Sequence, residues 1–306
     1  MAEEDNLSAV LYGPGDLRLE QREIPKMADN QLLISVHTVG IGTSDVEFLK
    51  RGTAGSIQLT EPIILGHETS GTVDAVGEKV TGFKAGDRVA LEPGIPCHKC
   101  SQCMIGKYNV CPDVTFFASP PYHGSLTRFV VHDANFCYKL PDNVSYEDGA
   151  LLEPLSVAVH ACRRAQLKNG TERANSRSRG MMPVEIRDAV VKSLGHEPEV
   201  TIECTGAQPC LESAILATRP GGVLVMVGLG APRIELPIVE AALREIDIRG
   251  VFRYASCYPI ALDLVASGRI NLSGLTRANY DLGHTLEAFE RAEKGDVIKV
   301  FIKCQK

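Results

Sequence analysis

Residues 200–230 read V-T-I-E-C-T-G-A-Q-P-C-L-E-S-A-I-L-A-T-R-P-G-G-V-L-V-M-V-G-L-G, and this stretch decides the fold class. Val200–Cys204 has the pattern of a buried strand, and Val223–Val227 is a second strand that is wholly apolar. Between them, Cys210–Thr218 carries apolar residues at helical spacing, and Pro220-Gly221-Gly222 ends that helix. Apolar strands that alternate with helices predict a parallel, doubly wound sheet, because such strands are buried on both faces.

The alternation continues on both sides of this stretch. Val184–Leu194 has the spacing of an amphipathic helix, Ile246–Phe252 is a third strand candidate, and Tyr258–Ser267 is a further predicted helix. Val297–Lys303 is predicted to be a closing strand. One segment breaks the pattern: Lys168–Pro183 is polar, rich in arginine and serine, and has no period, so it is predicted to be a solvated loop rather than a basic functional patch.

The first 150 residues have a different character, with short strand-like runs separated by glycines and no long helical period. This pattern favours a small barrel or sandwich. Two helical stretches follow Pro141, at Glu147–Leu155 and Val157–Arg164. The strand candidates of this part are Leu7–Leu11, Leu17–Arg22, Gln31–Val39, Gly71–Val76 and Asp87–Glu92.

The overall composition excludes several classes of protein. The chain has 306 residues, 32 of them basic and 38 acidic, and the resulting net charge of −6 argues against a nucleic-acid or anionic-membrane surface. No apolar run approaches the roughly 20 residues of a membrane-spanning helix. The acidic start, Met-Ala-Glu-Glu-Asp, does not resemble a secretory signal. A cytoplasmic protein is therefore expected.

Four of the ten cysteines form the strongest chemical motif, Cys97-x2-Cys100-x2-Cys103-x7-Cys111. Four thiolates this close in sequence can surround a soft divalent ion tetrahedrally, and zinc accepts such a ligand set. Because four protein ligands leave no coordination position open, the predicted zinc is structural and stabilises the fold of its lobe. An iron–sulfur cluster is the alternative.

The cysteine array lies between Gly66-His67-Glu68 and Leu152-Glu153-Pro154-Leu155-Ser156. With these flanks the chain resembles the zinc-containing medium-chain dehydrogenases, specifically their sorbitol (polyol) dehydrogenase branch. The resemblance covers nearly the whole chain except Gln166–Pro183. Other matching stretches are N-L-S-A-V-L-Y (6–12), D-L-R-L-E-Q-R (16–22), G-D-R-V-A (86–90), G-K-Y-N-V-C-P (106–112), K-L-P-D-N-V (139–144), I-E-C-T-G (202–206), V-G-L-G (227–230) and R-E-I-D-I-R-G-V-F-R-Y (244–254).

The resemblance implies an α/β fold in which a GroES-like β-barrel catalytic domain accompanies a Rossmann domain that is incomplete here. It implies three segments: a catalytic domain with a structural zinc lobe at 1–156, a shortened nicotinamide domain at 157–254, and a return segment at 255–306. It further implies zinc, NAD(H) or NADP(H), a polyol–ketose substrate pair such as that of sorbitol/L-iditol 2-dehydrogenase, and a homotetramer.

For the catalytic zinc, the resemblance assigns ligand roles to His67, Glu68 and Glu153. In the family this zinc polarises the hydroxyl or carbonyl oxygen while hydride passes to or from nicotinamide. The family's G-I-C-G-S-D-V-H reads here as G-I-G-T-S-D-V-E from residue 40 to 47, so Gly42 stands where a cysteine ligand is expected. Either the three side chains hold a weaker zinc through nitrogen and oxygen, or the site is empty. The lost thiolate favours an empty or weakly occupied site.

The remaining assignments from the resemblance concern the proton, the substrate and the cofactor. Ser44 and Asp45 match positions that relay the hydroxyl proton and orient the metal ligands. The substrate-contacting positions are Phe48, Phe116, Ser119, Arg253 and Tyr254. The cofactor-contacting positions are Cys204, Thr205, Gly206, Val227, Gly228 and Leu229.

A nicotinamide domain also needs a G-x-G-x-x-G turn between a strand and a helix. The G-x-G runs begin at Gly13, Gly40 and Gly228, and their third-glycine positions hold other residues: Arg18, Asp45 and Arg233. The stretch between residues 164 and 184, where the family places its first strand, helix and second strand, is shorter than the about 30 residues of a βαβ unit. Two hypotheses follow: a sorbitol dehydrogenase-like oxidoreductase, or a catalytically inactive chain, which is either a zinc-stapled homologue or a splice or gene-model fragment of such an enzyme.

Overall fold

The computed structural model describes residues 5–167 and 180–305. Residues 168–179, which make up most of the predicted polar loop, lie outside the described residues. The chain divides into two compact units, one made of residues 1–156 with 255–306 and the other of residues 157–254.

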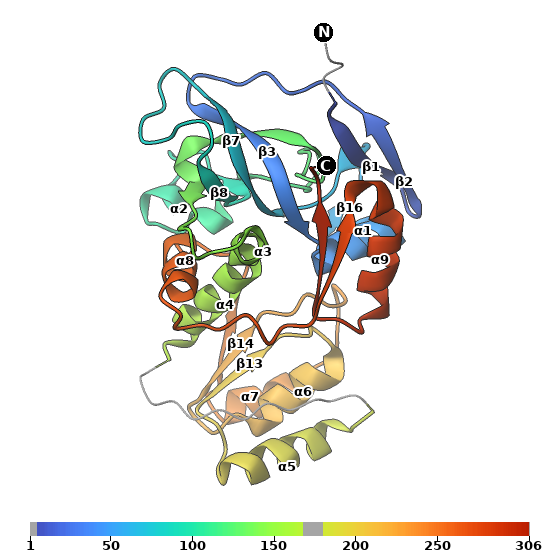
Figure 1. The fold of residues 1–306 in the computed structure, drawn as a ribbon. Helices are drawn as coiled ribbons and strands as arrows, with labels where there is room; N and C mark the ends of the chain where they lie inside the picture. Colours follow the sequence, from blue (N-terminus) through green and yellow to red (C-terminus); the bar gives the residue numbers. More distant parts are fainter. Residues whose placement is uncertain (1–4, 168–179, 306) are drawn as a thin grey trace. The chain divides into compact units, whose positions relative to one another are not determined.

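The main sheet of the first unit runs in the order β12-β8-β7-β3-β17-β16, and β11 also pairs with β3 (Figure 1). Its centre is β3 (Gln31–Gly40), in which Leu32, Ile34 and Val36 are fully buried. Because alternate residues of a strand point to the same face, this pattern packs one face of β3 into the core. The β-rich first part predicted from the sequence is confirmed.

The strands of this unit have the following bounds: β1 Leu7–Gly13, β2 Asp16–Gln21, β4 Thr53–Ala54, β5 Ile57–Gln58, β6 Ile63–Ile64, β7 Glu68–Val76, β8 Arg88–Leu91, β9 Gly94–Ile95, β10 Thr115–Phe116, β11 Phe129–Asp133, β12 Cys137–Lys139, β16 Arg277–Asp281 and β17 Lys299–Lys303. The C-terminal strand β17 pairs antiparallel with β3 and parallel with β16. Residues from both ends of the chain therefore build one sheet.

The helices of the first unit are short and lie between the strands: α1 Thr43–Arg51, α2 Ser101–Met104, α3 Tyr146–Ala150, α8 Tyr258–Ala266 and α9 Thr285–Lys294, with 3-10 turns at Tyr108–Val110, Ala134–Phe136 and Leu282–His284. The helix α4 (Leu152–Ala165) begins in the first unit and ends in the second. The predicted break after Leu155 is wrong, since the helices separate at Leu151. Pro154 explains the difference, because a proline is tolerated in the first turn of a helix but not in its interior.

The second unit contains a parallel sheet in the order β13-β14-β15, with bounds Val200–Glu203, Val223–Met226 and Asp247–Gly250. The end of α4 packs on one face of this sheet through Ala161 and Ala165. The helices α6 (Gln208–Ala217) and α7 (Ile238–Leu243) contribute Ala214, Ile215 and Ala241 to a cluster with Leu224 of β14. The helix α5 (Pro183–Leu194) packs against α6. The predicted parallel sheet with alternating helices is confirmed.

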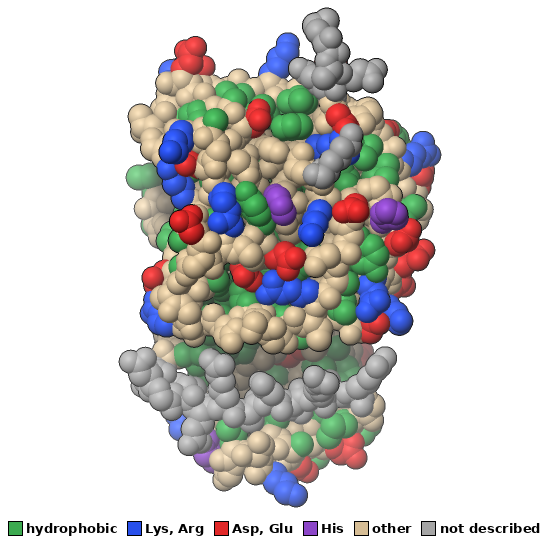
Figure 2. Space-filling model, viewed as in Figure 1, with side chains coloured by type: hydrophobic (Ala, Val, Ile, Leu, Met, Phe, Trp, Pro, Cys, Tyr) green, Lys and Arg blue, Asp and Glu red, His purple; other side chains and the backbone are tan. Residues whose placement is uncertain are grey.

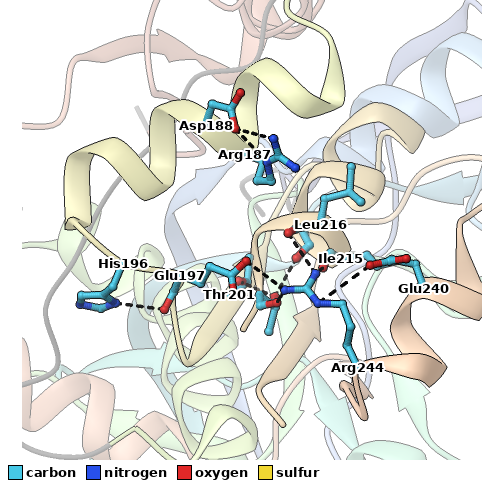
Figure 3. Close-up of polar contacts among 11 residues, drawn as sticks. Arg187, Asp188, His196, Glu197, Thr201, Ile215, Leu216, Glu240 and Arg244 are labelled. Carbon is cyan, nitrogen blue, oxygen red and sulfur yellow. Dashed lines mark hydrogen bonds and ion pairs between the residues drawn. The ribbon is translucent and has the colours of Figure 1, made fainter. Parts of the chain in front are cut away.

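Arg244 forms hydrogen bonds with the C-terminal end of α6 (Figure 3). Its guanidinium donates to the carbonyl oxygens of Ile215 (3.3 Å), Leu216 (3.1 Å) and Thr218 (2.6 Å), and it pairs with Glu197 at 3.2 Å. The last carbonyls of a helix have no partner within the helix. Arg244 supplies those partners and so caps the helix on which the sheet packs.

The surface is polar and mixed in sign. Figure 2 shows one face on which Lys and Arg side chains are interspersed with Asp and Glu, in keeping with a net charge of only −6. Among the described residues, none of the helices has the length and apolar character needed to cross a membrane.

Candidate functional site

The four cysteines of the C-x2-C-x2-C-x7-C motif come together in one lobe of the first unit. Their sulfur atoms all lie within 4.8 Å of one another, and the Cys100 and Cys103 sulfurs are 3.4 Å apart. The short helix α2 begins after Cys100 and carries Cys103, and Gly106 turns the chain with a φ of +75°. Local turns therefore place four thiols around one point.

The chemistry of this lobe fits a structural zinc ion. The backbone N–H of Lys99, with further N–H and thiol neighbours, lowers the pKa of the Cys97 thiol to about 7, and a thiolate is the form that binds metal. Four sulfur donors fill a tetrahedral zinc site completely. The four cysteines would therefore hold zinc as a fold-stabilising ion, and the lobe offers no open position for substrate.

A second group of possible metal ligands consists of His67, Glu68 and Glu153. One donor atom from each lies within 4.8 Å of the others, and the two carboxylates are buried. Glu68 opens β7 directly after His67, whereas Glu153 comes from the first turn of α4. The structure brings together the three residues that the resemblance selects, although they are up to 86 positions apart in sequence.

Asp45 holds His67 in place. Its carboxylate accepts hydrogen bonds from the backbone N–H of Gly42 and of Gly66, each at 2.9 Å, and one oxygen lies 3.3 Å from His67 Nδ1. Burial alone would raise the pKa of Asp45, but His67 and the two N–H groups outweigh it and lower that pKa. Burial likewise opposes the charged form of His67, yet Asp45, Glu153 and Glu68 raise the pKa of His67 to about 9. A carboxylate that fixes one ring nitrogen leaves the other to face a ligand.

Gly42 lies at the remaining side of this group. A Cβ atom on Gly42 would lie 2.7 Å from His67 Cε1 and 3.0 Å from His67 Nε2, so a side chain there would point at the site and the His67 ring would have to shift to admit it. The backbone of Gly42 is extended, with φ −88° and ψ 161°, a conformation open to every residue type. The glycine is therefore not required by the backbone, and the cluster has nitrogen and oxygen donors only. These residues do not fit the sulfur-anchored catalytic zinc implied by the family.

Lys299 is a functional candidate that sequence reasoning missed. Its ammonium lies 2.5 Å from both carboxylate oxygens of Glu68, and the lysine side chain is only 11% exposed. The Lys299 ammonium donates a hydrogen bond to Glu68 Oε1 and makes only an ionic contact with Glu68 Oε2. That second oxygen is buried and receives no hydrogen bond. The one sequence signal for a special role of Lys299 is its position inside the apolar run V-I-K-V-F-I, because lysine is rarely buried without a partner.

The predicted substrate residues of the first unit differ in their surroundings. Phe116 is buried with its ring centroid 6.0 Å from that of His67, so it borders the cluster. Phe48 is 2% exposed and belongs to the barrel core. Ser44 lies half-buried in the first turn of α1, and Ser119 is half-buried beside the Pro120–Pro121 cis peptide.

In the second unit, the predicted cofactor residues form two loops at the carboxyl ends of β13 and β14. The loop residues are Cys204, Thr205 and Gly206, and Val227, Gly228 and Leu229. The backbone N–H groups of Thr205 and Gly206 both donate to the buried carboxylate of Glu203, at 2.7 and 2.9 Å. The two loops touch backbone to backbone, because a Cβ on Gly228 would lie 2.1 Å from the nitrogen of Gly206.

Two backbone N–H groups of these loops are not available to a diphosphate group. A phosphate-binding turn presents free N–H groups to its ligand, whereas Glu203 already accepts those of Thr205 and Gly206. Near the end of the same unit, Arg253 has a φ of +51° and lies over the Phe252 ring at 4.7 Å, and Tyr254 is buried.

Comparison with known proteins supports a single family. Residues 28–142 match the family described as "Alcohol dehydrogenase GroES-like domain", and residues 157–267 match "Zinc-binding dehydrogenase". The chain is 43% identical to the sorbitol dehydrogenase of Mus musculus and 42% identical to that of Homo sapiens, in both cases over 99% of this chain and 97% of the relative. The crystal structure of 2R,3R-butanediol dehydrogenase from Bacillus subtilis is 26% identical, with a TM-score of 0.85 over 98% of this chain and 99% of that one.

A GroES-like unit, a parallel α/β unit and a four-cysteine lobe together define a zinc-binding dehydrogenase. The chain belongs to the zinc-containing medium-chain dehydrogenases, in their sorbitol dehydrogenase branch. By family it is an NAD-dependent, sorbitol dehydrogenase-like oxidoreductase, and zinc and a nicotinamide dinucleotide are the family's cofactors. One solved structure of the same fold, 22% identical with a TM-score of 0.84 over 98% of this chain and 99% of that one, is complexed with NADH.

The same comparison measures what the chain lacks. The alignment with the mouse relative spans 346 positions, 40 more than this chain has residues, so at least 40 positions of the relative have no counterpart here. That number is larger than the about 30 residues of a βαβ unit. The deficit agrees with the absence of a G-x-G-x-x-G turn from the sequence.

Proposed function

We propose that this chain takes a polyol and its ketose as ligands and oxidises a secondary hydroxyl of the polyol with NAD, as a sorbitol dehydrogenase-like oxidoreductase. The observation that carries the proposal is the grouping of His67, Glu68 and Glu153 within 4.8 Å, beside Asp45 and Phe116. Buried carboxylates next to an aromatic ring can accept hydrogen bonds from several hydroxyls while the ring covers the carbon skeleton.

The chain's own residues would serve this chemistry in three ways. Ser44, in the first turn of α1, would accept the proton of the reacting hydroxyl and pass it to water. Glu153 and Glu68 would accept hydrogen bonds from neighbouring hydroxyls. In the second unit, Arg253 has five N–H donors, and the role that the resemblance assigns to it is to donate hydrogen bonds to polyol hydroxyls. A homo-oligomer is part of the proposal, and sedimentation velocity measures it.

A second candidate function is a zinc-stapled homologue without redox turnover, which would act as a partner in mixed oligomers. Three observations favour it: Gly42 supplies no thiolate, Glu203 accepts the N–H groups of Thr205 and Gly206, and at least 40 positions of the mouse relative have no counterpart. Loss of an electrophile that stabilises an alkoxide costs several kcal/mol of transition-state energy. That loss corresponds to a rate lower by about a thousandfold or more.

Metal analysis combined with an NAD titration separates the two candidates. The purified chain is assayed for zinc content, for NAD binding by calorimetry, and for conversion of sorbitol to fructose. Turnover that Glu153→Gln abolishes and the exposed control Glu78→Gln preserves would establish the enzyme. One zinc per chain, no heat of NAD binding and no fructose would establish the non-catalytic homologue.

A further inference from the structure

We propose that His67, Glu68 and Glu153 form a sulfur-free site for a divalent cation, whose preference is shifted from zinc toward harder ions of the manganese class. The inference concerns the identity of a bound metal and does not require turnover. It starts from the disagreement between the ligand set implied by the family and the one this chain presents.

The donor set is the first observation. One imidazole nitrogen and two carboxylates converge within 4.8 Å, and within the described parts of the chain this group contains no cysteine. All three side chains are fixed by the fold: His67 by Asp45, Glu68 by Lys299, and Glu153 by its place in the first turn of α4. The donors are therefore arranged before any ion binds, which lowers the entropic cost of binding.

The charge balance is the second observation. Asp45, Glu68 and Glu153 are all at most 6% exposed, and the Lys299 ammonium lies 2.5 Å from the Glu68 carboxylate. With His67 neutral, as a metal ligand must be, these four side chains carry two net negative charges. Buried charge without a counter-charge is unfavourable. A divalent cation would add positive charge beside these carboxylates, and Glu68 Oε2 has lone pairs that accept no hydrogen bond.

The absence of sulfur determines which cation is favoured. A thiolate is soft and selects zinc, whereas carboxylate oxygens suit harder ions such as Mn²⁺ and Mg²⁺. Zinc still binds a nitrogen–oxygen site more tightly than manganese in absolute terms. What changes is the ratio of the two affinities, which should be much smaller here than at the same site with a cysteine.

Gly42→Cys provides the decisive comparison, because the extended backbone of Gly42 suits any residue and the new sulfur would face His67, whose ring must shift from the 2.7 Å contact that a Cβ would make with its Cε1. Gly274→Cys is the matched control, since a Cβ there meets nothing within 4 Å. The full-length chain, with zinc retained in its four-cysteine lobe, is titrated with MnCl2. Loss of the electron paramagnetic resonance signal of free Mn²⁺ reports binding, and back-titration with ZnCl2 gives the affinity ratio.

The expected result is one Mn²⁺ bound per chain, and none in His67→Ala or Glu153→Gln that keep their lobe zinc and circular dichroism spectrum. Gly42→Cys should raise the ratio of zinc to manganese affinity by at least about tenfold, while Gly274→Cys leaves it unchanged. Absence of Mn²⁺ binding, or equal ratios in wild type and Gly42→Cys, would overturn the proposal. Neither result depends on polyol oxidation, so the proposed function is tested separately.

Discussion

The ion pair between Lys299 and Glu68 offers the sharpest test of how the site is held together. The substitution Lys299→Met keeps the length and apolar character of the lysine stem but removes its ammonium. Glu68 then retains a buried carboxylate whose Oε2 receives no hydrogen bond. We expect a large loss of stability in the first unit.

The size of that loss follows from burial. The side chains of Lys299 and Glu68 are 11% and 4% exposed, so water screens the pair little. Removing one partner of a buried pair costs about 3–5 kcal/mol. Because Glu68 can take up a proton when its partner is lost, the lower end of that range, about 3 kcal/mol, is expected. The double variant Lys299→Met/Glu68→Gln should lose only about 1 kcal/mol, since replacing both partners leaves no unpaired charge.

Tyrosine fluorescence during urea denaturation provides the assay. The chain has no tryptophan, and seven of its eight tyrosines belong to the first unit, Tyr254 being the exception. The four proteins of the double-mutant cycle are compared without added metal and with equal zinc in the lobe. A loss below about 1 kcal/mol for Lys299→Met, or a double variant as unstable as the sum of the two singles, would refute the reasoning.

Three further predictions address other parts of the chain. Arg244→Ala should lower the free energy of unfolding of the second unit by about 2 kcal/mol, because three carbonyls at the end of α6 lose their donor. Hydrogen exchange of the α6 amides measures this loss, with Arg244→Lys as the control. Cys103→Ser should remove the lobe zinc and make the protein's melting temperature insensitive to chelators, as differential scanning calorimetry would show. Burial lowers the pKa of His132 to about 4, although the hydrogen bond with the Glu92 carbonyl partly offsets this effect. Because the unfolded chain then binds a proton at a higher pH than the folded chain, the free energy of unfolding is at its full value above pH 6.5 and falls by about 3 kcal/mol toward pH 4. His132→Gln should flatten this pH dependence, as urea titrations would measure.

The regular elements of the fold could be predicted from the sequence because their patterns are local. Gln31–Val39 is a short run rich in Leu, Ile and Val and forms β3 almost to the residue, and Val184–Leu194 forms all but the first residue of α5. The two-residue strands β4, β5 and β6 could not be predicted, because so short a pairing has no period. The four-cysteine lobe was predictable since its ligands lie within fifteen residues.

The second cluster was predictable only through resemblance. His67 and Glu153 are brought together by the barrel and the start of α4, which no local pattern specifies. Lys299 reaches Glu68 across 231 positions, and only the register of β17 beside β3 decides that contact. Glu203 is one of two polar residues in the strand V-T-I-E, and its hydrogen bonds to the following loop depend on backbone geometry that the composition does not encode.

The position of β17 between β3 and β16 affects how the chain can fold during synthesis. Residues Thr38–Gly40 of β3 pair with the last strand, which leaves the ribosome only after the whole of residues 157–254 has been made. Until then that edge is open to pairing with other chains. The nascent first unit therefore cannot complete its sheet until β17 has been synthesised. Chaperones or a slow translation rate should affect the yield of this protein more than the yield of a protein whose strands pair in chain order.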